Sequence, residues 1–147
     1  MRFILIDELI TLVPGQRATA ARTVSPEDDY FRDHFPGFPV VPGVLLTEMM
    51  AQTAGKCLDA EQRPRGKAML ARIMSASFRH WVKPADKLLI EAEIVANTER
   101  YATANCSVTV VETIAAQAQL FFSFLPSDAL APGFRDTVLE TFLAGGR

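Results

Sequence analysis

DHFPGFPVVPGVLLTEMMAQTAGKCL, residues 33–58, is the segment from which the architecture of this chain can be worked out. Prolines and glycines stiffen and turn its first half, which predicts a loop. From residue 44 onward apolar side chains fall on nearly every face of a helix, and such a helix is either buried or spans a membrane. The run is too interrupted and too short for a membrane span, which needs ~20 apolar residues. We therefore expect a buried central helix.

Two polar side chains interrupt this apolar helix, and a histidine precedes it. Glu48 and Gln52 lie one turn apart on the same face, so Gln52 can orient the Glu48 carboxyl by hydrogen bonding. An acid on a buried helix is costly unless it has a partner or a function, and desolvation favours its protonated, proton-donating form. His34 suits proton abstraction near neutral pH. Gly43, at the helix start, lets a carbonyl oxygen approach free N–H groups. These are the groups that an α,β-elimination beside a thioester carbonyl requires.

Composition limits the possible classes of protein. The 147 residues are 49% apolar and 22% charged, which predicts one globular domain over residues 1–147. A net charge of −2 gives no reason to expect nucleic-acid binding. Two cysteines and two histidines are too few for a zinc site at ligand spacing, and we expect neither metal nor cofactor. The start does not resemble a secretion signal and no long apolar run occurs, so we expect a cytoplasmic protein without a membrane segment.

The remaining pattern predicts an α+β fold. A hairpin is expected over 8–13 and 16–24, and Ser25 with Pro26 signals a short helix. Period-two alternation after the central helix predicts strands at 68–73, 77–82, 88–96, 100–111 and 114–124. Residues 126–147 form a C-terminal extension with the pattern of a short amphipathic helix. One curved antiparallel sheet wrapped around one long helix satisfies this pattern, and its exposed edges favour a dimer.

The stretch HFPGFPVVPGVLLTEMMAQTAG closely resembles the signature of the FabZ-type 3-hydroxyacyl-acyl-carrier-protein dehydratases, a hotdog-fold family. RFILIDELITLVPGQR and SFRHWVKPADKL resemble other family segments more weakly. The resemblance implies conversion of 3-hydroxyacyl-acyl-carrier-protein to the trans-2-enoyl form without a cofactor, in the biosynthesis of fatty acids or of related lipids and polyenes. It implies a homodimer or a trimer of dimers, and acyl carrier protein as the partner.

The resemblance also implies roles for individual residues. His34 takes the C2 proton, Glu48 from the other subunit protonates the C3 hydroxyl, and the Gly43 N–H polarises the thioester carbonyl. The sequence departs from the family pattern at Asp33, Arg72, Met74 and Ala85, the last in place of a turn glycine. The departures at Arg72 and Met74 bear on the shape of the acyl tunnel.

A basic rim is a further candidate site. Arg79, His80 and Lys83, with Arg63, Arg65 and Lys67, can contact an acidic carrier protein or can simply be solvated charges. His80 is expected on the surface of the sheet.

Two other functions share the fold. A hotdog acyl-thioesterase would attack the thioester with water, and a non-catalytic hotdog subunit would only bind acyl-carrier thioesters. His34 argues against the first alternative, and the presence of both His34 and Glu48 argues against the second.

Overall fold

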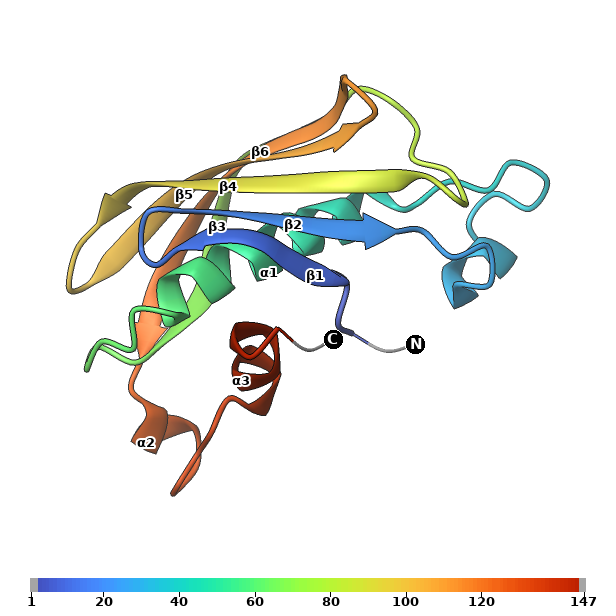
Figure 1. Ribbon diagram of the computed structural model, residues 1–147. Helices are drawn as coiled ribbons and strands as arrows, with labels where there is room; N and C mark the ends of the chain where they lie inside the picture. Colours follow the sequence, from blue (N-terminus) through green and yellow to red (C-terminus); the bar gives the residue numbers. More distant parts are fainter. Residues whose placement is uncertain (1–2, 146–147) are drawn as a thin grey trace.

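The computed structural model describes residues 3–145, which form one six-stranded antiparallel sheet and the helices that it supports (Figure 1). The strands lie in the order β1-β2-β4-β5-β6-β3. Their bounds are β1 Glu8–Val13, β2 Arg17–Thr23, β3 Lys67–Phe78, β4 Lys87–Asn97, β5 Tyr101–Val110 and β6 Thr113–Leu125. The sheet curves around helix α1, Gly43–Asp59, as the α+β prediction requires. Within the described range no helix is long and apolar enough to cross a membrane.

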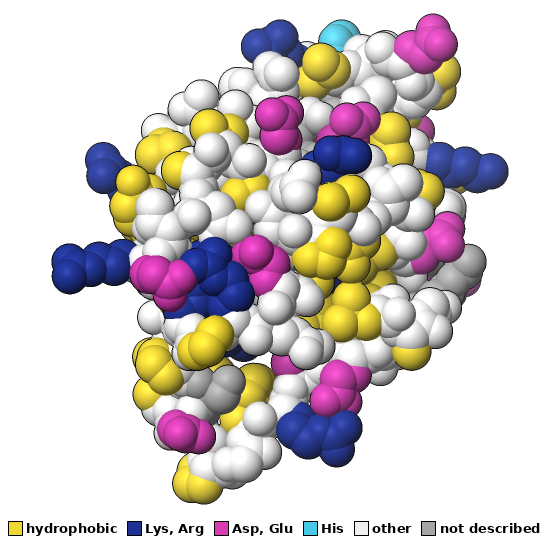
Figure 2. Space-filling model, turned by 60° about the vertical axis from the view of Figure 1, so that its left-hand side comes forward, with side chains coloured by type: hydrophobic (Ala, Val, Ile, Leu, Met, Phe, Trp, Pro, Cys, Tyr) yellow, Lys and Arg dark blue, Asp and Glu magenta, His cyan; other side chains and the backbone are white. Residues whose placement is uncertain are grey.

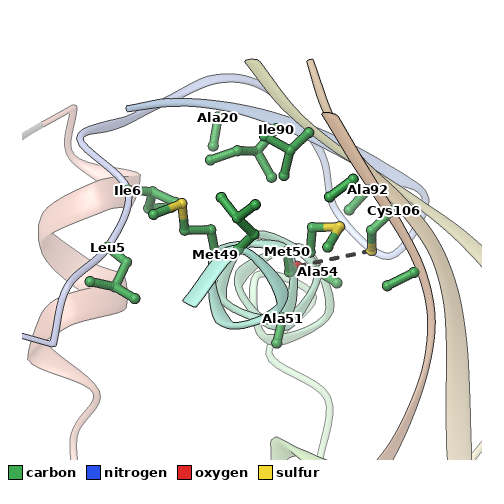
Figure 3. Close-up of a cluster of buried hydrophobic side chains, with 14 of the residues drawn as sticks. Leu5, Ile6, Ala20, Met49, Met50, Ala51, Ala54, Ile90, Ala92 and Cys106 are labelled. Carbon is green, nitrogen blue, oxygen red and sulfur yellow. Dashed lines mark hydrogen bonds between the residues drawn. The ribbon is translucent and has the colours of Figure 1, made fainter. Parts of the chain in front are cut away.

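Small residues on the concave face of the sheet let α1 lie close to it. Strands β2, β4 and β5 alternate buried and exposed positions, and many of the buried ones are alanine. Met49 and Met50 project from α1 into this surface and are fully buried (Figure 3). Flexible methionine side chains fill the space that alanines leave between the helix and the sheet.

Two predicted elements differ from the structure. The strand predicted at 77–82 does not exist as such: β3 is continuous to Phe78, and the chain then turns out of the sheet. Arg79 N and His80 N both donate to the carbonyl oxygen of Ala115, which ends the regular pairing. His80 is therefore exposed beyond the strand and not on the sheet surface.

The short helix predicted at Ser25 begins later. The Ser25 hydroxyl accepts a bond from the Glu27 N–H, but the helix η1 is a single 3-10 segment, Asp29–Arg32. The local hydroxyl–backbone bond forms a turn instead of a helix start.

The chain after β6 forms two short helices, α2 (Ser127–Leu130) and α3 (Thr137–Leu143). Helix α3 lies on the side of α1 away from the sheet (Figure 1), where Leu139 and Phe142 are buried. Asp136 caps it by accepting a hydrogen bond from the Leu139 N–H at 2.9 Å.

Candidate active site

The proline-rich loop between η1 and α1, which carries His34, projects beyond one end of the sheet (Figure 1). The His34 N–H donates to the Tyr30 carbonyl, and the loop is fixed further on where Val41 N donates to Val82 O at 2.7 Å. His34 Nδ1 lies 2.9 Å from the carbonyl oxygen of Val40. Because a carbonyl only accepts, Nδ1 carries the proton in this contact. The neutral ring therefore presents Nε2 as the acceptor, which is what a general base needs.

The start of α1 leaves backbone donors free. Pro42 is the N-cap residue, and no side chain caps the helix. Leu45 N and Leu46 N donate to Pro42 O, whereas the N–H groups of Gly43 and Val44 have no acceptor among residues 3–145. A Cβ on Gly43 would lie 3.2 Å from the Phe78 ring, so glycine also permits this aromatic contact. The free N–H groups and the positive helix end can bind a carbonyl oxygen.

Gln52 holds Glu48 in place from the next turn of α1. Gln52 Nε2 donates to Glu48 Oε1 at 3.2 Å and to the Phe3 carbonyl at 2.8 Å. Gln52 Oε1 accepts from the Leu5 N–H at 2.9 Å. The amide is thereby fixed by the segment before β1, and it orients one carboxylate oxygen. The hydrogen bond expected between the two side chains is present; its part in catalysis is still a prediction.

Within one chain, His34 and Glu48 have different hydrogen-bond partners. No hydrogen bond or ion pair among residues 3–145 joins them, and both side chains are half-buried. Glu48 opens into a groove of about 250 Å³ between α1 and the start of β3, lined by Glu48, Ala51, Gln52, Gly55, Lys56, Asp59, Lys67, Ala68, Met69, Leu70 and Phe122. His34 is not part of that lining. A single chain therefore supplies the candidate base and the candidate acid to different places.

The six basic residues considered as a rim lie in two groups at opposite ends of β3. Arg79, His80 and Lys83 are exposed just after the end of β3. Arg63 and Arg65 precede β3 and Lys67 is its first residue, which a 12-residue strand places ~36 Å from the other end.

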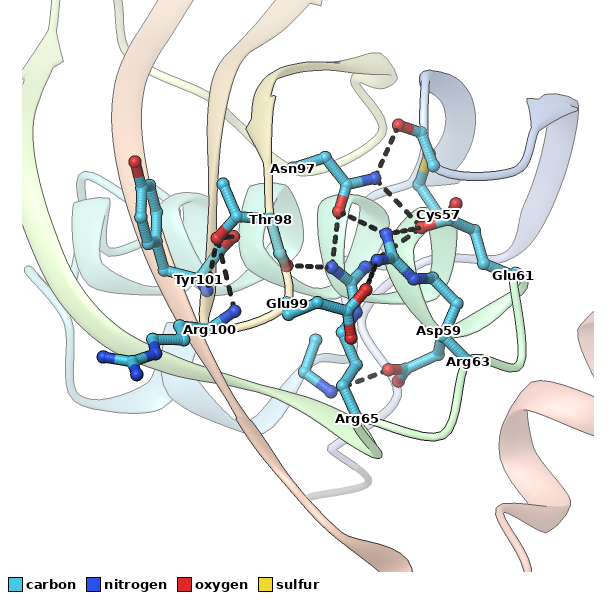
Figure 4. A network of polar contacts seen from close by, with 12 residues as sticks. Cys57, Asp59, Glu61, Arg63, Arg65, Asn97, Thr98, Glu99, Arg100 and Tyr101 are labelled. Carbon is cyan, nitrogen blue, oxygen red and sulfur yellow. Dashed lines mark hydrogen bonds and ion pairs between the residues drawn. The ribbon is translucent and has the colours of Figure 1, made fainter.

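Arg65 is moreover buried in a network of its own (Figure 4). Its guanidinium donates to Asn97 and Glu61 and lies over the Phe124 ring. Arg63 pairs with Glu99. Arg65 is thus buried and paired, and the partly exposed Arg63 is paired as well. On the face shown in Figure 2, acidic and basic side chains lie around a hydrophobic patch.

Sequence reasoning missed one aromatic contact beside the site. The Phe38 and Trp81 rings meet edge to face at 5.9 Å between centroids and join the proline-rich loop to the basic segment after β3. Both rings are at least half exposed, Trp81 by 67%. A large apolar side chain beside Arg79 and His80 was the available signal.

No group of three or more His, Cys, Asp or Glu side chains suited to a metal ion occurs in the described part of the chain. A larger hollow of about 560 Å³ lies over strands β2, β4, β5 and β6, and it contains neither His34 nor Glu48.

The sequence matches a family model described as a FabA-like domain over residues 1–119. A protein of Listeria monocytogenes serotype 4b, named 3-hydroxyacyl-[acyl-carrier-protein] dehydratase FabZ, is 35% identical over 122 residues, which cover 82% of this chain and 85% of that protein. A protein of the same name from Bacillus pumilus is 34% identical over 125 residues, with 84% and 87% covered.

Solved structures resemble the fold at lower sequence identity. AziG of S. sahachiroi superposes with a TM-score of 0.66 at 16% identity, covering 81% of this chain and 90% of that one. The protein smu.793 from Streptococcus mutans, bound to acetyl CoA, gives 0.67 at 15%, with 86% and 94% covered. At such identities the likeness concerns the fold alone.

Proposed function

Because this chain belongs to the FabA-like family and resembles its FabZ dehydratases along most of its length, we propose that it converts 3-hydroxyacyl-acyl-carrier-protein to trans-2-enoyl-acyl-carrier-protein in fatty-acid biosynthesis. The observation that carries the proposal is the presence, in one hotdog fold, of a histidine whose Nε2 is available as an acceptor and of a carboxyl group on the central helix.

The reaction follows from three groups. His34 Nε2 takes the C2 proton of the substrate, while the free N–H of Gly43 binds the thioester oxygen on which negative charge develops. Glu48 in its protonated form donates to the C3 hydroxyl, which leaves as water. The double bond forms between C2 and C3. His34 then returns its proton to solvent and Glu48 regains one. The reaction is therefore balanced in protons and electrons without a redox partner or a metal.

The separation of His34 and Glu48 within one chain supports a site built across two subunits. Strand β3 is an edge of the sheet, and nearly all of its residues are exposed. Among them are large apolar side chains: Met69, Leu70, Ile73, Met74 and Phe78. Pairing two such edges satisfies their backbone groups and covers the apolar side chains. We propose a homodimer across β3, in which Glu48 of one subunit serves His34 of the other; a trimer of dimers stays a prediction.

Acyl carrier protein is the proposed partner of the segment after β3. Arg79, His80 and Lys83 are exposed there beside the Phe38–Trp81 contact and close in sequence to Phe78, which packs on Gly43. Cations at this end would attract an acidic carrier and bring its phosphopantetheine arm to the helix start. Cytoplasmic location stays a prediction from the sequence.

The test uses purified protein and a 3-hydroxyacyl-carrier-protein thioester. Wild type should form the enoyl thioester, whereas a thioesterase would release free acid and a binding subunit would leave the substrate intact. His34→Ala and Glu48→Gln should each lower kcat by about 10²–10⁴-fold, the usual contribution of a general acid or base. Circular dichroism should be unchanged. A wild-type rate in either variant would remove that residue from the mechanism.

A further inference from the structure

The groove that begins at Glu48 changes character along its length. Beside Glu48 and Gln52 its walls are mostly small or apolar side chains of α1, β3 and β6. At the other end its lining consists of Lys56, Asp59 and Lys67. A helix rises ~1.5 Å per residue, so Lys56 lies ~12 Å beyond Glu48 along α1. An alkyl chain that entered this groove beyond Glu48 would meet these charges.

Helix α3 is anchored to the charged end of the groove by two contacts. Lys67 Nζ forms ion pairs with Asp59, at 2.7 Å, and with Asp136, the residue that caps α3. Lys56 Nζ lies 5.0 Å from the centre of the Phe142 ring, within the range of a cation–π contact. Burial lowers the pKa of Lys56, which is consistent with an ammonium held away from bulk water.

We propose that helix α3, together with the side chains of Lys56 and Lys67, sets the longest acyl chain that this dehydratase accepts. The inference rests on the proposed function. An alkyl chain that reached past Lys56 would have to displace α3 or desolvate two ammonium groups and two carboxylates without replacing their partners, and burying such charges is costly. The FabA-like match ends at residue 119, so α3 and Asp136 lie outside the matched region, whereas Lys56, Asp59 and Lys67 lie within it.

The experiment measures kcat/KM for saturated 3-hydroxyacyl-carrier-protein thioesters of increasing length and compares the longest with the shortest. Lys56→Leu replaces the ammonium with an apolar side chain, and Asp136→Asn releases Lys67 while keeping a capping residue. Both should raise the long-to-short ratio, Lys56→Leu by about tenfold, which is the scale of discrimination for a methylene in an apolar pocket. The matched control is Arg135→Gln, which breaks the exposed pair with Glu140 and should leave the ratio unchanged.

The ratio is independent of how much of a variant folds, because both substrates meet the same active fraction. If wild type forms enoyl product and either Lys56→Leu or Asp136→Asn keeps the wild-type ratio, the length stop is refuted and the dehydratase assignment stands. If wild type forms no enoyl product from any substrate, the proposed function itself is refuted, and this inference with it.

Discussion

Gln52 is the residue that joins helix α1 to the segment before β1. Its side-chain amide uses both ends: the oxygen accepts from Leu5 N–H, and the nitrogen donates to Phe3 O and Glu48. A glutamine that is satisfied in this way cannot rotate without losing several bonds at once. The orientation of the Glu48 carboxyl is therefore set by residues almost fifty positions away, and a change before β1 can alter the site without touching it.

Ala85 offers a stability prediction at the scale of one residue. Its φ of +73° is left-handed, and its N–H donates to Val24 O in the turn before β4. That conformation costs an alanine ~1–2 kcal/mol, whereas glycine adopts it freely but loses ~0.4–1 kcal/mol through unfolded-state entropy. Ala85→Gly should therefore raise the free energy of unfolding by about 0.5–1 kcal/mol, measured by urea denaturation. Ala60→Gly, where φ is −62°, should lower it, and the opposite order would refute the strain argument.

At the scale of an element, the attachment of α3 should weaken in acid. Burial by itself would raise the pKa of Asp136, but the bonds from Lys67 and the Leu139 N–H outweigh it and leave the pKa below its usual range. A lowered native pKa stabilises the fold above the ordinary carboxyl pKa of ~4, and this stabilisation disappears as the pH falls through the native value. Asp136→Asn should thus cost about 1 kcal/mol at neutral pH and almost nothing near pH 2.

The measurement is the difference in melting temperature between wild type and Asp136→Asn across this acidic range. Asp59 acts in the opposite direction, because burial raises its pKa and protonation removes the free-energy cost of a buried negative charge. It is present in both proteins, so its own contribution largely cancels in the difference. Arg135→Gln serves as the control and should show no such pH dependence. A difference that persisted undiminished at pH 2 would show that the ion pair is not its source.

The elements that local periodicity specifies were predictable, and those that depend on distant partners were not. The helix expected from residue 44 spans Gly43–Asp59, and the alternation at 88–96 corresponds to β4, Lys87–Asn97. Strand β3 was divided wrongly because it pairs with β6 through two irregularities, which break the two-residue period. Likewise, the sequence signature selected His34 and Glu48, but the anchoring of α3 through Lys67 joins residues 69 positions apart and leaves no local pattern.

At the scale of the whole molecule, a second copy of the chain would account both for the open edge at β3 and for the different positions of the candidate base and acid. The sheet ends in β1 on one side and in β3 on the other. Only β3 combines an unpaired edge with the groove at Glu48, since Ala68, Met69 and Leu70 line that groove. A second copy placed against β3 would therefore cover apolar side chains and close the groove in one step. Two-fold pairing of this kind produces two equivalent sites per dimer.

Subunit complementation tests this arrangement. If each site takes His34 from one subunit and Glu48 from the other, a heterodimer of His34→Ala and Glu48→Gln chains contains one intact site and one doubly defective site. An equal mixture, unfolded together and refolded, should form half heterodimers and recover about one quarter of the wild-type kcat per chain.

Adding Ile73→Lys to both chains places a charge on the exposed β3 edge, and it should abolish the recovery and give monomers in sedimentation. Val111→Lys in both chains is the matched control, because this exposed side chain lies in the turn between β5 and β6. Mixtures that stay as inactive as their components, despite forming dimers, would mean that each chain builds its site alone.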